Sequence, residues 1–329
     1  MNYLICSIGK HAKLIQNMKN SIGEDSRIIV TANQEMLPAL YFADKQYVVP
    51  DVHDKHYITE LIKICEAENI NAITTMLDVE TIILAENRSC FNSIGVEVLT
   101  PSIETAKLCF DKYSMFEYLS SNEIRTIKSY KNIDDFKNDY IVGRCKFPVF
   151  VKPNTGRGSV GARKVYTFEE LKSICIEDNN LIIQEYIEGI EIDVDVYVDI
   201  ISHKPVSIFS KKKIEAKIGG TTKAISFKDQ GLFVFIEELV SKFKFTGPIN
   251  IEVFYVNGEY ILTEINPRFS AAYLHAYGCG VDFFKLMENN LNGFENIASF
   301  GDYKENIIMM MYNDVLIMNQ SELVTINEV

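Results

Sequence analysis

The stretch FPVFVKPNTGRGSVG (residues 147–161) decides how this chain is interpreted. Its glycines Gly156, Gly158 and Gly161 form a G-x-G-x-x-G pattern, which in a dinucleotide-binding fold follows a strand and opens directly into a helix. Here the next residues, Arg163–Tyr166, favour a second strand instead. The pattern therefore predicts a glycine hairpin whose backbone N–H groups can approach phosphates. An exposed hairpin that uses glycine only for positive φ is the alternative.

A second pattern follows in NIEVFYVNGEYILTEINPR (residues 250–268). Two alternating strands flank an Asn-Gly pair, which is a strong cue for a hairpin. Glu252, Glu264 and Asn266 carry the hard oxygen atoms that Mg²⁺ prefers. Two buried glutamates without a cation would repel each other, so the pattern predicts a metal site. An ordinary hairpin with solvated glutamates is the alternative.

The strand register makes the metal prediction testable. A two-residue turn pairs Val256 with Glu259 and sends Glu252 and Glu264 to opposite faces of the hairpin. A three-residue loop, or one extra bulged residue, pairs Val256 with Tyr260 and places the two carboxylates opposite each other. We therefore predict the longer loop, because only that register brings both carboxylates to one ion.

Residues 1–100 alternate short apolar runs with helical patterns. Strand-like segments at 3–8, 27–31 and 72–75 alternate with amphipathic stretches such as 57–69. This order predicts a doubly wound α/β unit with a parallel sheet. Only Gly9 stands at the first turn, so the glycine fingerprint of dinucleotide-binding folds is absent there and a nicotinamide-dependent oxidoreductase is disfavoured.

The pattern changes after this unit. Pro101 and Ser102 mark a break at which we expect a helical stretch that extends to about Ser121. From residue 147 onward the sequence becomes rich in strand-like segments, interrupted by helical patterns. The chain is therefore expected to be mixed α/β, with an α+β body behind the doubly wound unit.

The composition excludes several classes of protein. The 329 residues include 33 Lys+Arg and 45 Asp+Glu, a net charge of −12, whereas a protein that coats nucleic acid needs a basic surface. No apolar stretch approaches the roughly 18 residues of a membrane span, and the start lacks a signal-peptide pattern. The seven cysteines are dispersed without a C-x-x-C pair, which favours reduced thiols and a cytoplasmic protein.

Charge is distributed unevenly along the chain. Residues 185–199 contain six acidic residues and no Lys or Arg, and residues 203–228 contain seven lysines and one glutamate. In the acidic strand, Glu191, Asp193 and Asp195 share one face by alternation. The basic segment is either a face paired with its acidic neighbour or an anion-binding loop. We expect a mixture, with one or two functional lysines.

These pieces, in this order, resemble the ATP-grasp superfamily, and within it the group similar to the carbamoyl-phosphate synthase large subunit, here with a single ATP-grasp unit. The resemblance covers Tyr3 to about Phe284. It is carried by ALYFADKQYVVP (39–50), CFDKY (109–113), FPVFVKP (147–153), the glycine loop, QEYIEGIEIDVDV (184–196) and TEINPRFS (263–270).

The resemblance implies a fold in three parts. A doubly wound, Rossmann-like pre-ATP-grasp domain would occupy residues 1–100. A helical linker and the small lobe with the glycine loop would occupy 101–185, and the large lobe with the Mg²⁺-binding hairpin would occupy 186–329.

The resemblance also implies roles for single residues. Arg268 and Lys152 would act on the transferring phosphoryl group, and Glu252, Glu264 and Asn266 would hold Mg²⁺. The segment 184–187 would recognise adenine and Glu191 the ribose. Including Lys213 from the basic segment, the residues expected at ATP are Lys112, Lys152, Gly156, Gly158, Ser159, Gly161, Gln184, Glu185, Tyr186, Ile187, Glu191 and Lys213.

The implied activity is an ATP- and Mg²⁺-dependent ligase, with Mn²⁺ as a substitute, that joins a small carboxylate to an amine or ammonia through an acyl-phosphate. ADP and phosphate would be released, and a homodimer is left open. The alternative is an inactive nucleotide-binding regulatory or scaffold protein with the same fold. Asp78 and Glu80, which follow a strand, are expected either to face the cleft and select an amino group or to be solvated at a helix start.

Overall fold

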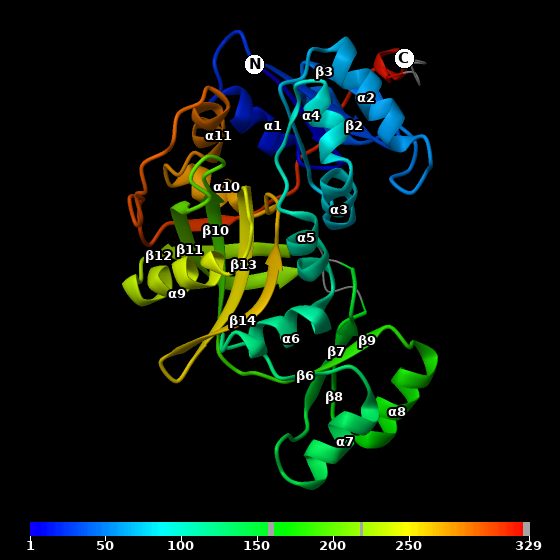
Figure 1. Ribbon diagram of the computed structural model, residues 1–329, viewed down its shortest axis with the longest axis vertical. Coiled ribbons are helices and arrows are strands. Elements are labelled where there is room, and N and C mark those ends of the chain that lie inside the picture. The colour runs from blue at the N-terminus through cyan, green and yellow to red at the C-terminus, as the bar shows by residue number, and fades with distance from the viewer. Residues whose placement is uncertain (157–160, 218–219, 325–329) are drawn as a thin grey trace.

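The computed structural model describes residues 1–156, 161–217 and 220–324. It consists of an N-terminal α/β domain, a central six-stranded sheet and a smaller lobe, which lie from top to bottom in Figure 1. Within the described residues, no helix has the length and apolar character needed to cross a lipid bilayer. All seven cysteines are free thiols, four of them buried.

The N-terminal domain is built on a parallel sheet with the order β3-β2-β1-β4-β5. Alternate residues of β1 face opposite layers: Tyr3 and Ile5 pack with helix α1, and Leu4 and Cys6 pack with α2. Helices therefore cover both faces, and the prediction of a doubly wound unit is confirmed. The elements are β1 (Asn2–Cys6), α1 (Ala12–Lys19), β2 (Arg27–Ala32), η1 (Pro38–Phe42), β3 (Lys45–Val48), α2 (Tyr57–Ala67), β4 (Ala72–Thr75), α3 (Asp78–Glu86), α4 (Arg88–Ser93) and β5 (Glu97–Val98).

Two helices rather than one follow this domain. Ser102 caps α5 (Ile103–Phe110) by accepting from the Thr105 N–H. Asp111 then ends α5 and caps α6 (Lys112–Ser121) through the Ser114 N–H. The expected single stretch to Ser121 is therefore divided, because an aspartate whose side chain accepts from the backbone starts a new helix.

The smaller lobe has a four-stranded sheet with the order β6-β9-β7-β8. Strands β7 and β8 pair antiparallel on either side of the glycine segment, with Val151 opposite Arg163, so the predicted strand–loop–strand arrangement is confirmed. The elements are β6 (Ser129–Tyr130), α7 (Ile133–Ile141), β7 (Val149–Pro153), β8 (Arg163–Val165), α8 (Phe168–Glu177) and β9 (Leu181–Glu185).

The larger sheet has the order β14-β13-β10-β11-β12-β15 and is antiparallel throughout. One face is apolar: Ile192, Val194 and Val196 of β10 belong to the same buried cluster as Leu232 and Ile236 of α9. The elements are β10 (Ile190–Val198), β11 (Pro205–Lys217), β12 (Gly220–Phe227), α9 (Gln230–Ser241), β13 (Gly247–Val256), β14 (Glu259–Asn266), α10 (Tyr273–Gly278), α11 (Phe283–Leu291), β15 (Ile308–Met310) and η2 (Gln320–Glu322).

The β13–β14 hairpin corrects one prediction and confirms another. The longer loop is wrong: Val256 pairs with Glu259 across a two-residue turn, whose residues both have positive φ, as Asn-Gly prefers. A bulge then leaves Thr263 unpaired between two ladder positions. Beyond it Glu252 lies opposite Glu264, as expected, so the extra residue is in the strand and not in the turn.

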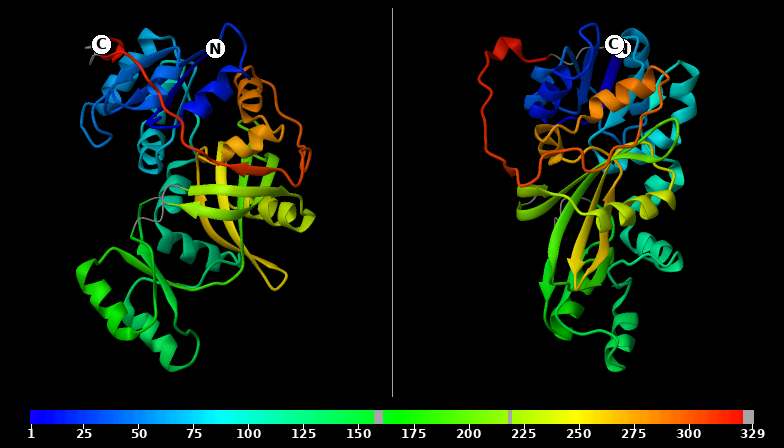
Figure 2. Two further views of the ribbon diagram at one scale, coloured as in Figure 1. Left: turned by 180° about the vertical axis from the view of Figure 1, so that it is seen from behind. Right: turned by 90° about the vertical axis from the view of Figure 1, so that its left-hand side faces the viewer.

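The C-terminal segment returns to the N-terminal domain. Strand β15 pairs with the edge of β12, and the chain then extends along the molecule, as the red trace in Figure 2 shows. Near its end the Val324 N–H donates to the Tyr41 hydroxyl at 3.5 Å. This segment, for which the sequence offered no interpretation, therefore links the large sheet to the first domain.

Candidate active site

The face of the large sheet opposite its apolar side is polar. Cross-strand partners project to the same face, and the register places Asp193 opposite Glu252 and Glu252 opposite Glu264. The neighbouring row joins Asp195, Asn250 and Asn266 in the same way. The residues of this polar face are Glu191, Asp193, Asp195, Lys211, Lys213, Asn250, Glu252, Glu264 and Asn266.

Two lysines offset the carboxylates of Glu252 and Glu264. The Lys213 Nζ lies 2.5 Å from Glu252 Oε2, and the Lys152 Nζ lies 3.8 Å from Glu264 Oε2. Burial alone would lower the pKa of Lys213, but the carboxylates of Glu252, Asp193 and Glu191 together outweigh it and raise that pKa above its usual value. Lys213 therefore stays protonated beside Glu252.

The donor set at this position fits a hard divalent cation. Glu252, Glu264 and Asn266 lie on one face and offer carboxylate and amide oxygens, the ligands that Mg²⁺ accepts. Among the described residues no group of three or more His, Cys, Asp and Glu side chains is arranged so that it could hold a metal ion by itself. A metal ion here would therefore need further oxygen ligands, such as phosphate or water.

Lys152 and Lys112 reach the site from outside the large sheet. Lys152 lies on β7 and is nearly enclosed; its burial, together with the charges of Lys112 and Lys213, lowers its pKa despite Glu264. Lys112 is the first residue of α6 and donates through Nζ to the Gly156 carbonyl at 3.0 Å. The two lysines thus concentrate positive charge at the glycine segment.

Two glycines of the glycine segment, Gly156 and Gly161, lie within the described residues. Gly156 and Gly161 have φ of +112° and +79°, a conformation that favours glycine. Gly156 also lines a small cavity together with Glu264 and Asn266. Gly158 and Ser159, which were expected at the phosphates, lie outside the described residues.

The segment that joins the two sheets contains the residues expected at adenine. Gln184 lies within β9, and its buried amide donates to the Ser129 hydroxyl at 2.8 Å. Glu185 is exposed, Ile187 is half-buried, and the Tyr186 ring centre lies 3.6 Å from the Lys164 Nζ. Of these side chains, that of Gln184 is therefore already engaged inside the smaller lobe.

The ribose candidate lies further along, at the start of β10. Glu191 is half exposed, and its carboxylate is 3.8 Å from the Lys213 Nζ. It therefore lies next to the lysine that pairs with Glu252.

Arg268 forms a two-point ion pair across a domain boundary. Its Nε and Nη2 lie 2.7 and 2.8 Å from the Asp78 carboxylate, at the start of α3 in the N-terminal domain. Asp78 also lines the small cavity beside Glu264 and Asn266, and its selection of an amino group stays a prediction. The expectation that Glu80 faces the cleft is wrong: its side chain is fully buried and hydrogen-bonded to Tyr57 and Thr75.

The basic segment is a hairpin and not a loop. β11 and β12 pair as far as Lys217 and Gly220, and residues 218–219 lie outside the described residues. Lys211 is fully buried between Asp193 and Asp195, and Lys223 lies 3.0 Å from Glu215. The pairing of the basic segment with its acidic neighbour is therefore confirmed for Lys211, which is closed to any substrate.

One residue and one contact were missed in the sequence. Asn250 lies two positions before Glu252, so strand alternation could have placed it on the same face. The partner of Arg268 is 190 positions away in Asp78, and no local pattern signals such a contact.

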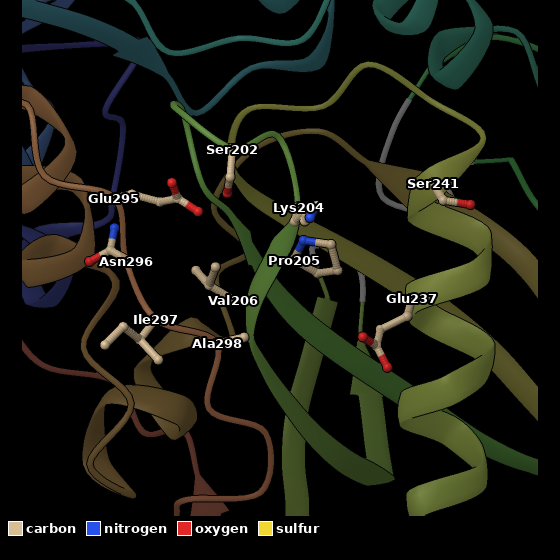
Figure 3. Close-up of a pocket in the computed structure, with 10 residues that line it drawn as sticks. All are labelled: Ser202, Lys204, Pro205, Val206, Glu237, Ser241, Glu295, Asn296, Ile297 and Ala298. Atoms are coloured by element: carbon tan, nitrogen blue, oxygen red, sulfur yellow. The ribbon is translucent and has the colours of Figure 1, made fainter.

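A larger cavity lies elsewhere. Its volume is about 670 Å³, and it is formed by the start of β11, α9 and the segment after α11 (Figure 3). It shares no residue with the polar face. Its lining residues are Ser202, Lys204, Pro205, Val206, Glu237, Ser241, Glu295, Asn296, Ile297 and Ala298. We place the candidate site at the polar face because charged groups from both lobes meet there.

Comparison with known proteins adds two family matches. Residues 3–99 match the model of the PylC-like N-terminal domain, and residues 109–272 match the ATP-grasp domain. Together the two matches account for most of the chain.

Curated relatives are similar over limited lengths. D-alanine–D-alanine ligase B of Clostridium perfringens is 36% identical over 99 residues, which are 28% of this chain and 32% of that protein. The arginine-specific large chain of carbamoyl phosphate synthase from Bacillus subtilis is 22% identical over 258 residues, which are 74% of this chain. The match spans only 24% of that larger protein.

Solved structures share the fold. N5-carboxyaminoimidazole synthetase from Staphylococcus aureus, complexed with ADP, has a TM-score of 0.72 at 17% identity and covers 92% of this chain and 79% of its own. The biotin carboxylase domain dimer of 2-oxoglutarate carboxylase from Hydrogenobacter thermophilus, in complex with MgADP, has a TM-score of 0.70 at 17% identity, covering 93% of this chain and 73% of its own.

Glu80 makes the stability of the N-terminal domain depend on pH. Burial raises the pKa of its carboxyl from 4.5 to about 8. Between these values the folded state holds a proton that the unfolded state has lost, so stability falls as pH rises. We expect the free energy of unfolding to fall by about 1.4 kcal/mol per pH unit relative to Glu80→Gln, between roughly pH 5 and pH 8. Urea unfolding of both proteins across this pH range measures the two free energies. A difference between them that does not change with pH would contradict the prediction.

Lys211 is expected to be structural. Lys211→Met leaves Asp193 and Asp195 buried without a counter-charge, and we expect a loss of about 3–5 kcal/mol in the free energy of unfolding. Lys212→Met is the matched control. The Lys212 ammonium lies on the other face of the sheet, 4.8 Å from the Phe227 ring centre. Its removal should lower the free energy of unfolding by about 1 kcal/mol or less. Chemical denaturation measures both variants. Equal losses of unfolding free energy in Lys211→Met and Lys212→Met would show that the buried ion pairs of Lys211 do not stabilise the fold more than Lys212 does.

Proposed function

Because the chain belongs to the ATP-grasp superfamily and carries a PylC-like N-terminal domain, we propose that it is an ATP- and Mg²⁺-dependent ligase that joins a carboxylate to an amine or ammonia. The main support is the polar face of the large sheet. There Glu252, Glu264 and Asn266 form an oxygen-rich set, and Lys152 reaches it from the smaller lobe.

The proposed roles follow the chemistry of each group. Lys112, Lys152 and Lys213 offer ammonium charges to phosphate oxygens, and the glycine segment with Gly156, Gly158, Ser159 and Gly161 offers backbone N–H groups. The segment 184–187 would take adenine and Glu191 the ribose. Glu252, Glu264 and Asn266 would hold Mg²⁺, for which Mn²⁺ can substitute, and the bound ion would neutralise phosphate charge.

The proposed reaction has two steps. A carboxylate oxygen of the substrate bonds to the γ-phosphorus of ATP while the bond from that phosphorus to the β-phosphate oxygen breaks, giving an acyl-phosphate and ADP. The amine then attacks the acyl carbon, phosphate leaves, and the amine loses a proton. Lys152 and Arg268 would offset the negative charge that develops on the transferring group.

Arg268 can serve this role only together with Asp78. Arg268 donates one hydrogen bond to Asp78 through Nη2, and its Nε lies close to the other carboxylate oxygen. This mostly enclosed ion pair holds the guanidinium at the boundary between the N-terminal domain and the large sheet. In this proposal Asp78 keeps Arg268 in place. The Nη1 atom, which donates one N–H to the Phe269 carbonyl at 3.0 Å, would offer its second N–H to the substrate.

The wider assignment is part of the same proposal. The three units would be residues 1–100, 101–185 and 186–329, and the protein would act in the cytoplasm on small molecules. A homodimer is included, in line with the dimeric biotin carboxylase domain among the similar structures. Light scattering after size-exclusion chromatography measures the assembly state.

The test is Mg²⁺-dependent ADP release with pairs of carboxylates and amines. We expect at least one pair to stimulate release and Lys152→Met to reduce that rate by about 100-fold or more, because a charge contact to the transferring phosphoryl group is lost. Lys172→Met is the control, since this lysine is exposed on α8 of the same lobe.

The outcomes separate the proposal from its rival. ATP binding without ADP release across a broad panel of acids and amines would contradict the ligase assignment. It would instead support an inactive nucleotide-binding regulatory or scaffold protein with this fold.

A further inference from the structure

A buried polar network lies directly behind the candidate metal ligands. The Asn250 Nδ2 donates to Asp193 Oδ1 and is 3.3 Å from Asp195 Oδ1. The Asn266 Nδ2 in turn donates to Asn250 Oδ1 at 3.4 Å. Lys211 pairs with both aspartates, and all five residues are at most 9% exposed.

The two aspartates are held from several sides. The Ser270 hydroxyl donates to Asp195 at 2.9 Å, and the Thr221 hydroxyl donates to Asp193 at 3.0 Å. Asp193 also forms an ion pair with Lys211, whose Nζ lies 3.3 Å from its Oδ1. A carboxylate that is paired with an ammonium group and receives these hydrogen bonds acts as an acceptor.

This acceptor determines the direction of the next amide. If Asn250 turned its oxygen toward Asp193, two acceptors would face each other in a buried position, which is costly. Asn250 must therefore present its NH₂ group to the aspartates and its oxygen to Asn266. Asn266 then has to present its own NH₂ group to Asn250.

The orientation of the Asn266 amide determines which of its atoms faces the candidate site. With its NH₂ group turned inward, Asn266 directs Oδ1 to the site, where the Arg268 Nη2 donates to it at 3.4 Å. The reversed amide would place N–H donors against the guanidinium, and an amide NH₂ group cannot bind a cation. The use of Asn266 as an oxygen ligand thus requires one of its two amide orientations.

We propose that Asn250 is a positioning residue: it transmits the polarity of the buried Asp193–Asp195–Lys211 cluster to the amide of Asn266 and so keeps the oxygen of Asn266 toward the metal position. This inference rests on the proposed function, because it assumes a cation at Glu252, Glu264 and Asn266. It adds a residue that touches neither the cation nor ATP.

The experiment compares two losses of hydrogen bonding at the same carboxylate. Asn250→Leu removes the link between Asp193 and Asn266 while keeping the number and branching of the non-hydrogen side-chain atoms. Thr221→Val removes a different donor to Asp193, one whose hydroxyl bonds to the aspartate and not to either asparagine. The readout is the affinity of Mn²⁺ for each protein in the presence of ATP, followed by electron paramagnetic resonance, together with ATP affinity in the presence of EDTA.

The expected result is selective. Asn250→Leu should weaken Mn²⁺ binding by about 10-fold or more, as loss of a residue that orients a metal ligand does, while ATP affinity in EDTA stays unchanged. Thr221→Val should keep Mn²⁺ affinity close to that of the wild type even though it also loses stability. Asn250→Ser, which keeps a small hydroxyl donor near Asp193, should show the same Mn²⁺ effect if the leucine variant does not fold.

Three results would overturn the inference. Wild-type Mn²⁺ affinity in the Asn250 variants would refute this inference and leave the proposed function standing. An equal loss in Thr221→Val would show a general effect of the buried cluster on the sheet rather than an oriented amide. A wild-type protein that binds no Mn²⁺ with ATP would refute the proposed function and this inference with it.

Discussion

Charge compensation on the polar face of the large sheet is the constraint on which the rest of the structure depends. The cross-strand register brings the carboxylates of Asp193, Asp195, Glu252 and Glu264 onto one face. Like charges this close disfavour the folded state unless counter-charges lie among them. Lysines from the neighbouring strand β11 and from the smaller lobe supply those charges.

The lysines differ in how they can respond to a ligand. Lys211 is sealed between two buried aspartates, so its removal would leave charges that water cannot reach. Lys213 and Lys152 face glutamates that remain a quarter to a third exposed. In the proposed function these two lysines would exchange carboxylates for phosphates, while a cation takes the carboxylates.

Much of this arrangement could be predicted from the sequence. Alternation placed Glu191, Asp193 and Asp195 on one face, and the charge contrast between residues 185–199 and 203–228 predicted their pairing. The sequence could not show that Lys211 would be buried while Lys213 faces the cleft, because burial depends on the strands that pack alongside. Nor could it reveal the contact of Arg268 with Asp78, which depends on how the first domain lies against the sheet.

The β13–β14 hairpin meets two requirements at once: the turn preferred by its Asn-Gly pair and the register that places Glu252 opposite Glu264. The Asn-Gly pair favours a two-residue turn, and that turn alone would place Glu252 and Glu264 on opposite faces. The bulge at Thr263 absorbs the mismatch of one residue close to the site, and the Thr263 hydroxyl donates to the Glu252 carbonyl at 2.9 Å. Turn preference therefore determines one end of the hairpin and the strand bulge determines the other. The register of the two glutamates is thus set within a few residues of the carboxylates themselves and not by the length of the distant loop.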